Sequence, residues 1–249
     1  MKKKLFGLSA LYMMAIVFSG CIETPKHDPY GLAGKTHSAV TPADRKDDWW
    51  TQRHQQILNR VAQGNVDLIF VGDSITHGWE NTGKILWNQY YAPRNAVNMG
   101  FGGDQTQHVL WRLENGEING ISPKLAVLMI GTNNSGEINT AEEIADGIKA
   151  ICAKMRAKLP KTKILILAIF PRDEGASALR EKNAAASKLA SQIADDKNIF
   201  YLNINDKFLK PDGALSKDIM PDLLHPNEKG YEIWAQAIEP TVKKLMGEK

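Results

Sequence analysis

The stretch Val66-Asp67-Leu68-Ile69-Phe70-Val71-Gly72-Asp73-Ser74-Ile75-Thr76 decides how the rest of the chain folds. Residues 66–71 form a short apolar run, interrupted only by Asp67, that is rich in β-branched and aromatic side chains. Such a run is typical of a buried strand in a parallel sheet. It ends in Gly72-Asp73-Ser74, which combines a turn with residue types that begin helices. The stretch therefore predicts a strand, a tight turn and a helix.

Ser74 has two interpretations at this position. Where a buried strand stops and a helix starts, a side chain lies at the edge of an α/β sheet where such folds bind ligands. The positive end of the helix also favours negative charge there. Alternatively, Ser74 only caps the helix. The stretch by itself leaves both interpretations open.

The rest of the chain repeats the alternation of strand and helix. Further strands are expected at residues 96–99, 125–130, 164–170 and 199–204. Helices are expected at residues 47–62, 104–115, 141–159, 177–195 and 227–245, and Thr140-Ala141-Glu142-Glu143 has the pattern of a capping box. This alternation predicts an α/β fold with a doubly wound, five-stranded parallel sheet, in one domain that spans residues 46–247.

The first 45 residues differ from the rest in composition. Three lysines precede an apolar run at 5–18 and then Ser19-Gly20-Cys21, which is the order of a secretory signal peptide over residues 1–20. Residues 18–21 resemble the lipobox of bacterial lipoproteins, which implies that Cys21 is lipidated; the alternative is an ordinary signal peptide. Residues 21–45 are polar with scattered Pro and Gly, and we expect a flexible tether without a fold of its own.

Lipidation of Cys21 would attach the protein to a membrane without a spanning helix. We therefore expect an extracytoplasmic bacterial lipoprotein, periplasmic or at the cell surface. Ile22 follows Cys21 where an inner-membrane retention signal would have Asp, which favours the outer membrane.

Charge and cysteine content argue against several classes of function. The formal charge is +3, but residues 1–20 hold three lysines and no acid, so 28 basic and 28 acidic side chains remain. A nucleic-acid partner therefore has no electrostatic support.

Beyond Cys21 only Cys152 remains. It lies on one helical face with Ile144, Ile148 and Ile151, and we therefore expect a core thiol. Without His-Glu-x-x-His or Cys-x-x-Cys motifs, neither a metal nor another cofactor is expected.

Polar and glycine-rich motifs follow the expected strands. Because the carboxyl ends of parallel strands open onto one edge of the sheet, we expect these motifs to meet there. They are Gly72-Asp73-Ser74, Gly100-Phe101-Gly102-Gly103-Asp104, Gly131-Thr132-Asn133-Asn134, Pro171-Arg172 and Asp222-Leu223-Leu224-His225-Pro226. Serine, histidine and aspartate are the parts of a nucleophile–base–orienter triad. Glycine amides and an asparagine amide are typical oxyanion donors.

This ordered set of motifs resembles the SGNH (GDSL) hydrolase superfamily. The run from Asn98 to Leu113 is similar to the platelet-activating-factor acetylhydrolase catalytic subunits and their bacterial relatives. The likeness extends over residues 66–240. It implies a flavodoxin-like SGNH hydrolase fold and a serine esterase that acts on short acyl esters, acetyl above all.

The resemblance also implies a role for individual residues. Ser74 would be the nucleophile, His225 the general base and Asp222 its orienting carboxylate. The oxyanion hole would consist of the backbone N–H groups of Ser74 and Gly103 and the side-chain amide of Asn133.

Each motif also has a purely structural interpretation. Asp222-x-x-His225 is a common turn or half of a metal site, and Asn133 is a common turn residue. Residues 100–104 suit a dinucleotide loop, although Gln105 stands where the third glycine is needed. His77, one helical turn after Ser74, is a rival base. The remaining aromatic candidates are expected in the core rather than on a sugar platform: Trp79, Trp87 and Trp111.

The sequence therefore predicts a lipid-anchored serine esterase, with O-acetylated glycans and acetylated lipids as candidate substrates. An alternative from another class is a surface lipoprotein that binds carbohydrate or lipid and has lost turnover. Acyl transfer to an acceptor other than water would use the same residues. The sequence leaves the oligomeric state open.

Overall fold

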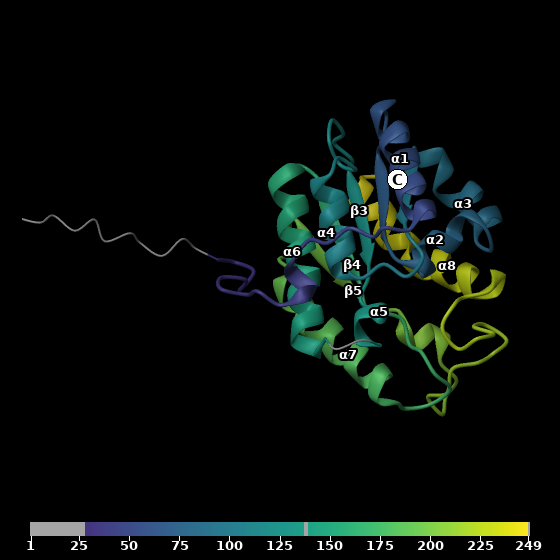
Figure 1. The fold of residues 1–249 in the computed structure, drawn as a ribbon. Coiled ribbons are helices and arrows are strands. Elements are labelled where there is room, and N and C mark those ends of the chain that lie inside the picture. Colours follow the sequence, from purple (N-terminus) through teal and green to yellow (C-terminus); the bar gives the residue numbers. More distant parts are fainter. Residues whose placement is uncertain (1–27, 137–138, 249) are drawn as a thin grey trace, which may run out of the picture.

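The computed structural model describes residues 28–136 and 139–248 of the chain (Figure 1). The predicted signal peptide and the lipidation site at Cys21 lie outside these residues and stay predictions. Within the described ranges, no helix has the length and apolar character that crossing a membrane requires.

Five parallel strands form one sheet, as predicted, and their order is β2-β1-β3-β4-β5. The strands are β1 (Leu68–Gly72), β2 (Ala96–Gly100), β3 (Leu125–Met129), β4 (Lys163–Leu167) and β5 (Ile199–Leu202). After β1 the chain adds β2 on one side, and it then crosses to β3 on the other side. The winding therefore reverses between β1 and β3, which is the point where open α/β sheets bind ligands.

Helices cover both faces of the sheet (Figure 1). Successive strand residues alternate between two cores, with Ile69 and Val71 in one and Leu68 and Phe70 in the other. The first core is covered by α1 (Asp48–Ala62), α4 (Thr106–Glu114), α6 (Ala141–Lys158) and α7 (Ala178–Ala190). The second is covered by α2 (Ser74–His77), α3 (Lys84–Tyr90) and α8 (Glu228–Met246). All residues of β1 and β3 are buried, as a sheet covered on both faces requires.

Short helical turns complete the fold: η1 (Ser38–Val40), η2 (Gly78–Glu80), η3 (Ala92–Arg94), α5 (Thr132–Ser135), η4 (Ser191–Ile193) and η5 (Asn205–Phe208). The capping box of α6 is confirmed, since Thr140 Oγ1 accepts from Glu143 N–H at 3.3 Å and Glu143 Oε2 from Thr140 N–H at 3.0 Å. Cys152 is fully buried, and burial raises the pKa of its thiol, so the prediction of a core cysteine is confirmed.

The predicted tether is wrong for its described part, residues 28–45, which we call the strap. The strap lies against α4 and α6, where Ala39 is fully buried and its carbonyl accepts from Thr106 Oγ1 at 2.8 Å. At its end, Arg45 Nη1 donates to Gly102 O at 2.7 Å. Backbone and charged groups hold the strap, so its polar, Pro- and Gly-rich composition concealed the packing.

Candidate active site

Ser74 is the first residue of α2, directly after β1. The capping interpretation of Ser74 is wrong, because the cap is Asp73, whose Oδ1 accepts from Ile75 N–H at 3.0 Å. The Ser74 hydroxyl instead lies 2.8 Å from His225 Nε2. The turn after β1 thus leaves the hydroxyl of Ser74 available at the edge of the sheet.

Asp222 and His225 lie in the loop before α8. Asp222 Oδ2 is 2.6 Å from His225 Nδ1, while Asp222 Oδ1 accepts the backbone N–H groups of Leu224 and His225 at 3.0 and 2.7 Å. One carboxylate oxygen therefore shapes the turn and the other binds the imidazole. With the proton on Nδ1, Nε2 is the nitrogen that accepts from Ser74.

The pKa of Asp222 reflects opposing effects. Burial raises it, but the hydrogen bonds from the His225 side chain and from the turn's backbone outweigh burial, and the pKa lies below its ordinary value. Asp222 is therefore ionised at neutral pH, as an orienting carboxylate must be.

Tyr231 joins the two halves of this arrangement. Its hydroxyl donates to Ile75 O at 2.7 Å, which ties α8 to α2. Gly78 permits this approach, since a Cβ there would lie only 2.0 Å from Tyr231 Oη. The sequence analysis did not identify Tyr231, because a lone helical tyrosine carries no motif.

The loop between β2 and α4 (residues 101–105) lies beside Ser74. A Cβ at Gly100 would lie 2.2 Å from His77 N, so glycine lets the end of β2 pack on α2. Gly103 has a φ of 75°, a conformation that glycine adopts without strain. Within the described residues its N–H meets no acceptor.

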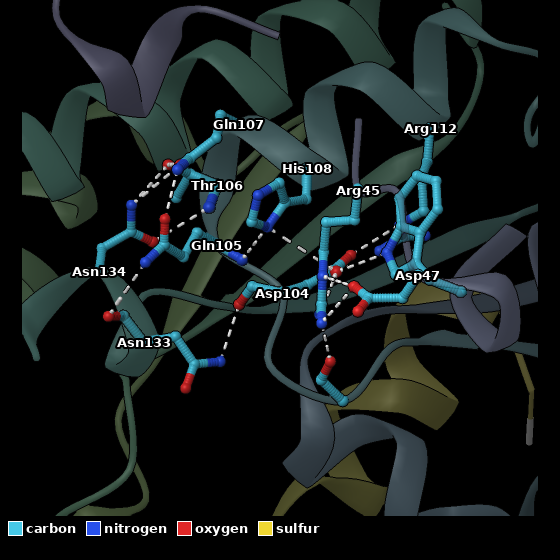
Figure 2. A network of polar contacts seen from close by, with 12 residues as sticks. Arg45, Asp47, Asp104, Gln105, Thr106, Gln107, His108, Arg112, Asn133 and Asn134 are labelled. Atoms are coloured by element: carbon cyan, nitrogen blue, oxygen red, sulfur yellow. Dashed lines mark hydrogen bonds and ion pairs between the residues drawn. The ribbon is translucent and has the colours of Figure 1, made fainter. Parts of the chain in front are cut away.

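Asn133, on α5 after β3, is bonded to the same loop (Figure 2). Its Nδ2 donates to Asp104 O at 2.8 Å. A side-chain amide has two N–H groups, so this bond fixes the orientation and leaves one donor for a ligand. The three predicted oxyanion donors thus come from the ends of β1, β2 and β3.

A buried network of charged groups lies under this loop, and Figure 2 shows its contacts at Asp104 and Arg112. Arg112 Nε donates to Asp104 Oδ2 at 2.8 Å, and its Nη1 donates to Glu117. Trp50 Nε1 donates to the other oxygen of Asp104 at 2.8 Å. All three charged side chains are fully buried. Burial raises the pKa of Asp104 above its ordinary value, although the charge of Arg112 and the hydrogen bond from Trp50 act to lower it.

Asp73 is also fully buried but is bonded differently. Burial raises its pKa to about 7. In the part of the chain that the structure describes, no donor reaches its Oδ2. Asp73 is therefore the cap of α2. Below pH 7 its carboxyl group is mostly protonated and uncharged.

His77 does not take the place of the base, because Ser74 is bonded to His225. Burial and then the charge of Arg53 lower the pKa of His77. Trp79 is fully buried, and Trp87 and Trp111 are half-buried against the two cores, so these residues are core aromatics as expected. A cavity of about 520 Å³ between α3 and α8 is lined by none of the triad residues.

Comparisons with known proteins agree with this arrangement. The sequence pattern of the GDSL-like Lipase/Acylhydrolase family matches residues 70–233. The chain is 37% identical to the rat (Rattus norvegicus) platelet-activating factor acetylhydrolase IB subunit alpha2 over 203 residues, or 81% of this chain and 87% of that protein.

Two solved structures share the fold. A GDSL-like lipase from Bacteroides thetaiotaomicron superposes with a TM-score of 0.61 at 22% identity, covering 79% of this chain and 96% of the other. An acetylxylan esterase from Geobacillus stearothermophilus superposes with a TM-score of 0.56 at 20% identity, covering 75% and 96%.

Proposed function

We propose that this chain, which belongs to the GDSL-like lipase/acylhydrolase family and is a carboxylic ester hydrolase, removes short acyl groups, acetyl above all, by a serine mechanism. The observation that carries the proposal is the hydrogen-bonded line from Ser74 through His225 to Asp222, with distances of 2.8 and 2.6 Å. The acetyl group is supported by the names of the relatives, an acetylhydrolase and an acetylxylan esterase.

In the first half of the reaction, Ser74 Oγ attacks the ester carbonyl while His225 Nε2 takes its proton. Asp222 holds the imidazole in the right tautomer and stabilises its positive charge. The oxyanion accepts from the N–H groups of Ser74 and Gly103 and from Asn133 Nδ2. The tetrahedral intermediate collapses, and His225 returns the proton to the leaving alcohol.

In the second half, water attacks the acyl-enzyme. His225 takes a proton from the water, the same donors stabilise the second oxyanion, and Ser74 leaves with the proton as the free acid is released. Asp222 and His225 are partly exposed, so water can reach the base.

The test is hydrolysis of p-nitrophenyl esters from acetyl to octanoyl by the full chain and its Ser74→Ala variant. We expect activity to fall steeply beyond propionyl and the variant to lose at least about 1000-fold in kcat. A serine-directed phosphonate should inactivate the wild type only. A folded wild type that hydrolyses no ester and resists the phosphonate would instead favour the binding-lipoprotein alternative.

The proposal includes the location of the protein. Residues 1–20 would direct export and Cys21 would carry the lipid, supported by the order of basic, apolar and small residues in the sequence. Labelled palmitate should be incorporated by the wild type expressed in a bacterium and not by Cys21→Ser. Equal labelling of both would contradict the lipid anchor.

A further inference from the structure

Trp49 is an exposed aromatic side chain beside the loop that contains Gly103. Of the large hydrophobic side chains in the described ranges, it and Ile85 are the two that are exposed, by 41% and 74%. A single exposed hydrophobic residue needs no explanation by itself. The position of Trp49 nevertheless suggests a role. Its neighbour Trp50 is buried against the core, whereas Trp49 lies over the loop that contains Gly103.

The glycines of that loop fix the position of the indole. A Cβ on Gly102 would be 3.8 Å from Trp49 Cη2 and 3.9 Å from His77 Nδ1. Gly102 therefore lies at the base of both rings, one residue before the proposed oxyanion donor. His77 itself is three residues after Ser74, which is one turn of helix away.

Two side chains hold the Trp49 ring in place. The rings of Trp49 and His77 are nearly parallel, with an angle of 14° and 6.5 Å between centroids. The guanidinium carbon of Arg45 lies 5.2 Å from the centre of the indole. We call Trp49, His77 and Arg45 the aromatic platform.

The charges around the platform decide what it can bind. Arg45 donates from Nε to Asp47 Oδ2 at 2.9 Å, from Nη1 to Gly102 O at 2.7 Å, and its Nη2 is 2.9 Å from Asp47 Oδ2. All three guanidinium nitrogens are thus engaged. Asp47 is half-exposed and balances the charge of Arg45. A phosphate headgroup would meet this carboxylate rather than a free cation.

A neutral sugar ring fits such a surface. The C–H face of a pyranose packs on the part of the electron-rich indole that Arg45 and His77 leave exposed, and its hydroxyls reach polar groups at the rim such as Asp47 and His77. A ring bound there would lie against Gly102, one residue before the proposed oxyanion donor Gly103, and could direct an ester on one of its hydroxyls towards that donor.

We infer that the aromatic platform is the subsite for the sugar that carries the acyl ester, so that the substrate is an O-acetylated glycan. This inference rests on the proposed short-acyl esterase activity. Trp49 would act on binding of the alcohol side of the ester, and not on the acyl group.

The test compares acetate release from an O-acetylated xylo-oligosaccharide with release from triacetin, an acetyl ester without a ring. For Trp49→Ala, we expect kcat/KM on the glycan relative to triacetin to fall about tenfold, through KM. Trp49→Phe should keep most of the ratio. Ile85→Ala, which removes the other exposed large apolar side chain at the α3–α8 cavity, is the control and should keep the wild-type ratio.

Binding gives a second readout that does not depend on turnover. In a Ser74→Ala background, calorimetry should show the affinity for the acetylated oligosaccharide falling about tenfold when Trp49→Ala is added. An unchanged ratio and affinity would overturn the inference. So would a loss in Ile85→Ala instead of Trp49→Ala, or a Trp49-dependent preference for an acetylated glycerophosphocholine over the glycan.

These outcomes separate the two proposals. A wild type that releases acetate from neither ester refutes the proposed function. A wild type that hydrolyses triacetin, with a ratio that ignores Trp49, refutes only the sugar subsite.

Discussion

Two groups of charged side chains at the same edge of the sheet differ sharply in exposure. The side chains of His225 and Asp222 are 42% and 56% exposed. Those of Arg112, Asp104 and Glu117 are completely buried. The first group would pass protons between substrate and water, and the second holds the loop that presents Gly103. In the proposed mechanism, the exposed groups therefore react and the buried groups position the loop.

The exposed group should govern turnover without governing stability. Asp222→Asn should lower kcat about 1000-fold, because the amide no longer stabilises the charged imidazole of His225 or fixes its tautomer. The free energy of unfolding should change by no more than about 1 kcal/mol, since the pair is exposed. Steady-state kinetics and urea unfolding measure both, with Asp218→Asn as an exposed control in the same loop. If Asp222→Asn kept its kcat but lost much of its unfolding free energy, the exposed pair would be structural rather than catalytic.

The buried group should show the opposite behaviour. Arg112→Met keeps the volume but removes the buried guanidinium between Asp104 and Glu117, which then retain Arg45 at 3.6 Å and His54 at 2.9 Å, and this should cost about 3–5 kcal/mol of unfolding free energy. Lys154→Met is the control, because Lys154 pairs with Glu114 at the surface. Its loss should be about 1 kcal/mol. Equal losses in urea unfolding would show that burial of the network is unimportant.

The two adjacent glycines of the loop sharpen the comparison further. Gly103→Ala would force a residue with a Cβ into a φ of 75° and bring that Cβ within 3.1 Å of Arg45 Nη1. The shift of the N–H group should lower kcat for triacetin about 10- to 100-fold. The Cβ of Gly102→Ala meets no atom closer than 3.8 Å. Its loss of kcat should be at least about tenfold smaller than that of Gly103→Ala. Equal losses would argue against Gly103 N–H as an oxyanion donor.

Asp73 provides the smallest expected effect, because it is buried like Asp104 but has no arginine bonded to it among the described residues. Its pKa is raised from 3.8 to about 7, so the stability from its neutral form is complete below 3.8 and is lost as pH rises towards 7. Asp73→Asn keeps an oxygen for the cap. The melting temperature of Asp73→Asn minus that of the wild type should therefore increase by several degrees between pH 4.5 and 7.5. Parallel curves would contradict a raised pKa.

The sequence predicted the sheet well because its signals are local. The five apolar runs have the length of buried strands, and a doubly wound order follows from their alternation with helices. The helix α3 was missed because it is short and none of its side chains is fully buried, so it has no strong amphipathic period. The strap was missed for a related reason, as Ala39 is the only residue of η1 that is buried.

The site was predictable where residues stand in short motifs and unpredictable where they do not. Ser74, Asp222 and His225 lie in Gly-Asp-Ser and Asp-x-x-His, and the structure brings them together. Arg112 and Tyr231 act through contacts between elements far apart in the chain, which no local pattern encodes. The helical spacing of Trp50 with His54 and Ile57 marks Trp50 as the buried tryptophan of the pair, but no local pattern places Trp49 beside Gly102.

Three contacts that hold the chain around the end of β2 come from residues before the matched family pattern. Arg45 binds Gly102 O, Trp50 binds Asp104 and Arg53 binds Gly100 O, and all three precede residue 70, where the family match begins. The family pattern is therefore shorter than the part of the chain that holds this loop, although the match to the rat relative covers 81% of the chain and takes in Trp50 and Arg53. A graft of residues 70–233 into another scaffold would transfer every motif residue and leave behind the parts that hold one of them still.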